Sequence, residues 1–133
     1  MIKAIAVTAA SLVVLVVAGY FFISSGGKPI STDLSTIGQG KPTLVLAYEN
    51  YSPTGGDALN QLRKVRSDFN TRLDFAVADL GTPLGRAFAD KYRLFDGLAV
   101  FLTKSGQPRG TIRIAADEQD LRKILESNLT TAD

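Results

Sequence analysis

The residue types best suited to chemistry lie together in one short segment, Ser52-Pro-Thr-Gly-Gly56. A serine hydroxyl becomes a nucleophile only beside a base, yet the chain has no histidine and none of its lysines has motif spacing to Ser52. Helix-cap preferences favour another role, in which Ser52 caps the helix that follows it. The sequence therefore predicts no catalytic residue. An enzyme that uses Ser52 remains the less favoured alternative.

The sequence also predicts no metal ion and no cofactor. Soft and imidazole ligands are lacking, because the chain has no cysteine, no histidine and a single methionine at its start. The acids Asp117, Glu118 and Asp120 lack EF-hand spacing and are typical of a helix start. Gly55 and Gly56 are not followed by the Lys-Ser or Lys-Thr of a phosphate-binding loop, so they indicate tight backbone geometry instead.

Residues 1–23 predict a transmembrane anchor. The segment from Ala4 to Ile23 carries no charge, and a helix of that length spans about 30 Å, the thickness of the hydrocarbon core. A cleaved secretory signal is the alternative, because Lys3 precedes the apolar run and Ala18 is a small residue suited to cleavage. The run continues past Ala18, which favours a retained anchor.

The charges around the anchor predict its orientation. Lys3 and the amino terminus lie on one side, and the positive-inside rule places them in the cytoplasm. The tether Ser24–Pro29 is short, so the following domain is expected close to the bilayer. We therefore expect a bacterial inner-membrane protein whose C-terminal domain lies in the periplasm.

The charged residues of the remaining chain are balanced. The chain has 15 Lys and Arg against 13 Asp and Glu, and all except Lys3 follow residue 23 in mixed order. A nucleic-acid surface needs a clustered basic patch, so we predict no nucleic-acid partner, and we predict no small-molecule substrate either. The local group Arg63, Lys64 and Arg66 is interpreted as a solvated helix face.

Residues 24–40 are predicted to form the tether and a short helical turn over Ser31–Ile37, and residues 41–133 an α/β domain. The apolar run Thr43–Tyr48 is typical of a strand buried on both faces. Thr82 and Pro83 suit the cap and first position of a helix that runs to about Arg93, with Leu84, Ala87, Phe88 and Tyr92 on one side. The other expected elements are a helix from about Asp57 to Asn70, strands at Leu73–Asp79, Leu98–Leu102 and Arg109–Ile114, and a helix from Asp117. This order predicts a mixed four-stranded sheet with helices on both faces.

The segment from about Lys41 to Leu129 resembles the thioredoxin superfamily. Lys41-Pro-Thr-Leu-Val-Leu-Ala47 is similar to the strand that leads into that family's active site, and Lys104-Ser-Gly106 is similar to its hairpin. Ser52-Pro-Thr-Gly55 takes the place of Cys-Gly-Pro-Cys, and Leu98 takes the place of the cis-proline beside the active site. The resemblance implies a thioredoxin-like fold without thiol–disulfide exchange, because that reaction needs a thiolate.

These features predict a redox-inactive, membrane-anchored protein that is an accessory subunit of a respiratory, photosynthetic or other inner-membrane complex. Its expected partners are the membrane and the protein subunits of that complex. A periplasmic chaperone that holds peptides is the alternative binding role. The candidate partner-contact residues surround the former substrate groove, where aromatic and apolar side chains suit an interface. They are Tyr48, Tyr51, Ser52, Pro53, Thr54 and Leu98.

Overall fold

The computed structural model describes residues 29–114 and 116–131. The predicted anchor, residues 1–23, and most of the tether lie outside this part of the chain. Among the residues that the structure describes, none of the helices has the length and hydrophobicity of a membrane span.

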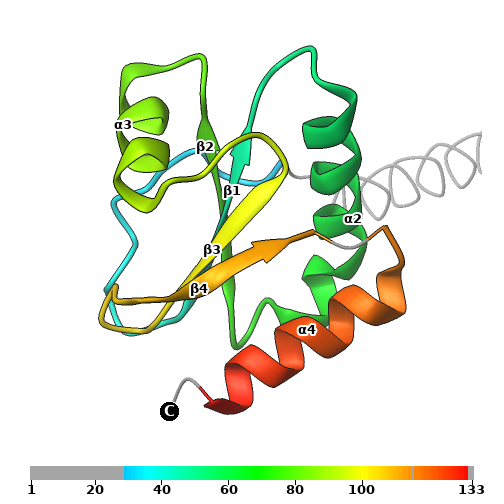
Figure 1. Cartoon of the computed structure of the whole chain (residues 1–133). Coiled ribbons are helices and arrows are strands. Elements are labelled where there is room, and N and C mark those ends of the chain that lie inside the picture. The colour runs from blue at the N-terminus through cyan, green and yellow to red at the C-terminus, as the bar shows by residue number, and fades with distance from the viewer. Residues whose placement is uncertain (1–28, 115, 132–133) are drawn as a thin grey trace, which may run out of the picture.

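A four-stranded mixed sheet forms the centre of the domain (Figure 1). Its strands are β1 (Thr43–Tyr48), β2 (Asp74–Asp79), β3 (Leu98–Leu102) and β4 (Pro108–Arg113), in the order β2-β1-β3-β4. Strand β1 pairs parallel with β2 and antiparallel with β3, and β3 pairs antiparallel with β4. The mixed sheet is therefore the one that the sequence predicts.

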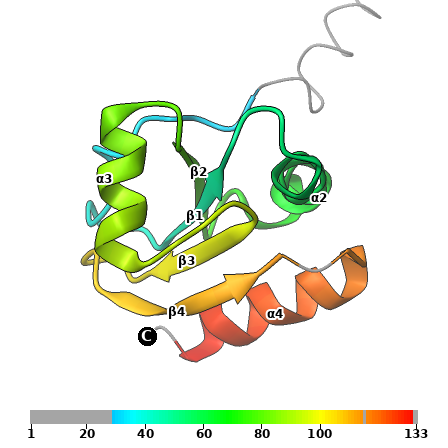
Figure 2. The ribbon, with the colours of Figure 1, turned by 45° about the horizontal axis from the view of Figure 1, so that its top comes forward.

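Helices cover both faces of this sheet, again as predicted. Helices α2 (Pro53–Phe69) and α4 (Glu118–Thr131) lie on one side, and α3 (Pro83–Tyr92) lies on the other (Figure 2). The fully buried residues of β1 alternate between the two sides: Leu44 and Leu46 pack toward α2 and α4, and Val45 and Ala47 pack toward α3. This alternation explains why the strand reads as one continuous apolar run.

Helix α2 begins four residues earlier than predicted, at Pro53 instead of Asp57. Proline suits the first helical position because its missing N–H needs no partner there. Gly55 and Gly56 lower helix propensity, which explains the later predicted start. In the structure the Gly55 N–H donates to Asp96 at 3.0 Å, and the Gly56 N–H donates to the Ser52 carbonyl at 3.1 Å.

Two other predicted segments differ in detail from the structure. In the predicted short helical turn over Ser31–Ile37, Ser31 forms a parallel bridge with Ala76, and hydrogen-bonded turns follow at residues 35–38 without a regular helix. In α3, the predicted apolar side is not the most buried one: Leu84 is 81% exposed, because the buried positions of that helix are Gly85 and Ala89.

Candidate contact surface

The loop between β1 and α2 holds one aromatic side chain in an unusual position. Ser52 N–H donates to the Glu49 carbonyl at 3.2 Å and closes a tight turn. Within this turn Tyr51 has φ of +80°, a left-handed conformation that non-glycine residues rarely adopt, and its side chain is 97% exposed. The loop therefore presents a tyrosine to solvent at a cost in backbone energy.

Asp96, in the loop that precedes β3, accepts hydrogen bonds from residues on both sides of Tyr51. Its Oδ1 accepts the N–H of Glu49 at 2.8 Å, and its Oδ2 accepts the N–H of Gly55 at 3.0 Å. The second bond is a helix cap supplied from 41 residues away, because Gly55 is the third residue of α2. Ser52 occupies the N-cap position as predicted, but its side chain makes no capping hydrogen bond.

Two glycines allow these loops to approach one another closely. A Cβ at Gly55 would lie 2.0 Å from Asp96 Oδ1, so a side chain there would displace the carboxylate. A Cβ at Gly97 would lie 2.8 Å from Thr54 Cγ2, and Gly97 also has φ of +89°. The expectation that Gly55 serves tight backbone geometry is confirmed, whereas Gly56 has open space beside it.

The structure does not gather the six predicted contact residues into one patch. Tyr48 is half-buried against the α2 and α4 side of the sheet, and Leu98 is half-buried against the α3 side. Tyr51, Pro53 and Thr54 are exposed, and Ser52 is half-buried. The part available to a partner is therefore the tip formed by Tyr51, Pro53 and Thr54, which we call the Tyr51 tip.

The chemistry around the Tyr51 tip is limited by the residues present. The whole chain supplies no thiol and no imidazole. Within residues 29–114 and 116–131 there is no group of three or more acidic residues that could hold a metal ion. The same ranges contain no cis peptide bond, so Leu98 follows a trans bond where the resemblance places a cis-proline.

Sequence reasoning missed the role of Asp96. An Asp-Gly pair is typical of a turn, and Asp96 and Gly97 lie in one. Nothing in the spacing shows that the carboxylate reaches the start of α2. One indirect signal was available: the first turn of α2 contains no acidic residue, so its N–H groups need an acceptor from elsewhere.

No protein-family model and no curated protein matches this sequence. Solved structures do resemble it. An uncharacterized thioredoxin-like protein from Clostridium perfringens aligns with a TM-score of 0.63 and 20% identity, over 74% of this chain and 79% of the other. A thioredoxin from Thermus thermophilus aligns with a TM-score of 0.57 and 22% identity, over 66% of this chain and 73% of the other. The chain therefore has a thioredoxin-like fold.

Proposed function

We propose that this chain is a non-catalytic, membrane-anchored thioredoxin-like protein that serves as an accessory subunit of a bacterial inner-membrane complex. Its N-terminal apolar segment anchors it, and its folded domain lies on the periplasmic side. The Tyr51 tip contacts another subunit. The missing cysteines remove thiol chemistry, so a binding role is the use of the fold that the residues favour.

The observation that carries this proposal is the conformation of Tyr51. The left-handed backbone conformation of Tyr51 costs about 1–2 kcal/mol relative to an ordinary backbone conformation. Because the side chain is 97% exposed, packing within the domain does not offset this cost. Strained residues of this kind concentrate at functional sites. Tyrosine is enriched in interfaces, and the Asp96 bonds hold the tip in place before binding, which lowers the entropy lost on association.

Copurification of the full-length chain from membranes in mild detergent tests this function. The informative variant combines Tyr51→Gly with Pro53→Ala, because glycine accepts the positive φ and alanine is a good helix former. We expect wild type to copurify with fixed subunits in constant ratio and the double variant to lose them. Ser52→Ala is the matched control in the same loop, and it should retain the complex.

Two results would contradict the proposal. One is a complex that survives the double variant unchanged. The other is a monomer with an enzymatic turnover that Ser52→Ala removes, which would support the serine alternative. Circular dichroism of each variant shows whether the fold is intact, so that loss of binding is not confused with unfolding.

A further inference from the structure

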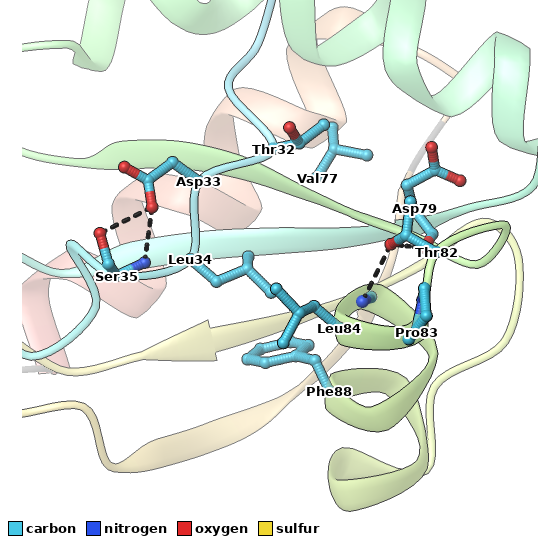
Figure 3. Close-up of a pocket in the computed structure, with 11 residues that line it drawn as sticks. Thr32, Asp33, Leu34, Ser35, Val77, Asp79, Thr82, Pro83, Leu84 and Phe88 are labelled. Atoms are coloured by element: carbon cyan, nitrogen blue, oxygen red, sulfur yellow. Dashed lines mark hydrogen bonds between the residues drawn. The ribbon is translucent and has the colours of Figure 1, made fainter.

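A second surface, which shares no residue with the Tyr51 tip, lies where α3 meets the segment of residues 32–35. A groove of about 840 Å³ opens there, within the range of 300–1,000 Å³ typical of ligand pockets. Its walls are mainly apolar, with Leu34 from the N-terminal segment facing Leu84 and Phe88 from α3 (Figure 3). We call this hollow the β2–α3 groove.

Local backbone geometry explains how the groove is formed. The N-terminal segment touches the edge of β2 at Ser31, whose carbonyl accepts the N–H of Val77 at 2.9 Å. The next residues then turn away from the sheet, because Asp33 N–H donates to Ser31 Oγ at 3.0 Å instead of continuing the ladder. The segment therefore leaves β2 before it reaches α3.

The other wall is fixed by close packing of α3 on β2. A Cβ at Gly85 would lie 2.0 Å from the Asp79 carbonyl oxygen, so the helix rests directly on the strand backbone. With Gly85 against the strand, the preceding residue Leu84 is left 81% exposed. A large apolar side chain is thus held in water at the mouth of an apolar groove, where a partner would bury it.

The charges that line the groove are both negative. Asp33, in the N-terminal segment, and Asp79, at the end of β2, are both lining residues, and Figure 3 draws their carboxylates turned away from Leu84 and Phe88, at the rim of the groove. No basic residue lines the groove. Oδ1 of Asp33 accepts the N–H of Ser35 at 2.9 Å, and Oδ1 of Asp79 accepts the N–H of Gly81 at 2.8 Å. These bonds hold both carboxylates in position and leave each Oδ2 without a bond to the described residues.

We propose that the β2–α3 groove binds a short segment of a partner polypeptide in which apolar side chains are flanked by Lys or Arg. The apolar side chains pack against Leu34, Leu84 and Phe88, and the basic groups lie beside Asp33 and Asp79. An anionic lipid surface is disfavoured, because its phosphates would meet two carboxylates. This site is separate from the Tyr51 tip and goes beyond the function proposed above.

Fluorescence anisotropy tests the site directly, with the full-length chain in zwitterionic lipid nanodiscs. The probe is a labelled peptide with the core Lys-Leu-Leu-Phe-Lys. Two matched peptides replace both lysines by glutamate or the apolar residues by serine. We expect binding of the first peptide and at least tenfold weaker binding of the other two, since each loses one of the two complementary features.

Protein variants locate the binding in the groove. Leu84→Ser should weaken binding by roughly tenfold or more, because a buried leucine is lost from the contact. Asp33→Asn and Asp79→Asn, which keep an acceptor oxygen, should each weaken it by about two- to fivefold, as expected for exposed ion pairs. Phe95→Ser is the control: Phe95 is 58% exposed and lies outside the groove, so its loss should change nothing.

Several outcomes would overturn this proposal. They are absence of binding by the lysine peptide, equal binding of the glutamate peptide, or binding that Leu84→Ser leaves unchanged. Light scattering that shows a dimer lost in Leu84→Ser would instead assign the groove to a second copy. A cross-link from the groove to residues 1–28 would assign it to the chain's own N-terminal segment. The peptide assay needs no other subunit, so its failure is independent of the copurification result.

Discussion

At the scale of single residues, Asp96 determines the geometry of the Tyr51 tip. One carboxylate satisfies the N–H groups of Glu49 and Gly55, which lie on either side of Tyr51. Hydrogen bonds to a charged group contribute about 1.5–3 kcal/mol, which is enough to offset the strain at Tyr51. The exposed tyrosine is therefore maintained by a side chain that belongs to another loop.

The two adjacent glycines of α2 provide a matched test of this contact. Gly55→Ala should lower the free energy of unfolding by about 1–3 kcal/mol, because the new Cβ meets Asp96 Oδ1. Gly56→Ala should raise it by up to about 1 kcal/mol, because the site is open and alanine favours the helix. Denaturant unfolding of the full-length chain in detergent, followed by circular dichroism, measures both changes.

A double-mutant cycle then identifies the cause of the Gly55 effect. In an Asp96→Ala background the carboxylate is absent, so Gly55→Ala should cost clearly less than it does in wild type. Equal costs in the two backgrounds would show that Asp96 does not constrain this position.

At the scale of elements, periodicity and turn residues predict most of the structure. Strands Thr43–Tyr48 and Leu98–Leu102 are predicted to the residue, because both are apolar runs bounded by turns. The errors lie where distant contacts override local preference. Gly55 has a low helix propensity, yet it lies in α2, where its N–H donates to Asp96. Leu84 matches the apolar period of α3, yet Gly85 is the buried residue at that end of the helix.

Contacts between distant residues also decide how much of the two candidate surfaces could be predicted from the sequence. The exposed tip was predictable, because Tyr51 and Pro53 stand in a turn-rich segment after a buried strand. Its support by Asp96 was not predictable, because a single Asp-Gly pair indicates only a turn. The β2–α3 groove depends on where residues 32–35 leave the sheet, which no local pattern specifies.

The N-caps of α2 and α3 differ in a way that stability measurements can detect. Thr82 Oγ1 accepts the Gly85 N–H at 3.1 Å and donates to the Asp79 carbonyl at 2.8 Å. We expect Thr82→Ala to lower the free energy of unfolding by about 1 kcal/mol. Ser52→Ala should change it by less than about 0.5 kcal/mol, since no capping bond is lost. Denaturant unfolding compares the two, and an equal loss at both sites would contradict the assignment of the α2 cap to Asp96.

At the scale of the whole molecule, ion pairs join the last helix to an earlier part of the chain. Lys64 and Asp68 of α2 pair with Glu118 and Arg122 of α4, and Arg72, just after α2, pairs with Glu126. Leu121 and Leu125 of α4 are fully buried in the same core cluster as the buried residues of α2. Each exposed ion pair contributes little to the free energy of folding, so apolar packing supplies most of the energy that holds α4 against the rest of the domain. The ion pairs make that energy depend on pH.

The ion pair between Arg72 and Glu126 determines in which direction the stability changes with pH. Two hydrogen bonds, at 3.0 and 2.5 Å, join the guanidinium to both carboxylate oxygens, and they lower the pKa of Glu126 below its ordinary value. The resulting stabilisation is complete above the unfolded-state pKa of about 4.3 and disappears as the pH falls through the lower folded-state pKa. Glu126→Gln should therefore destabilise the protein at pH 7, and the difference from wild type should shrink toward strongly acidic pH.

Unfolding of wild type and Glu126→Gln at a series of pH values measures this difference. Arg72→Gln should reproduce the pH-dependent part, because it removes the same hydrogen bonds. It should also show a loss at every pH, because the Arg72 guanidinium lies 5.3 Å from the ring centroid of Phe69 and would no longer cover it. Combining both substitutions should add no further pH dependence, since either one removes the pair. A stability difference between wild type and Glu126→Gln that stays constant from neutral to strongly acidic pH would show that this pair does not couple α4 to the rest of the molecule.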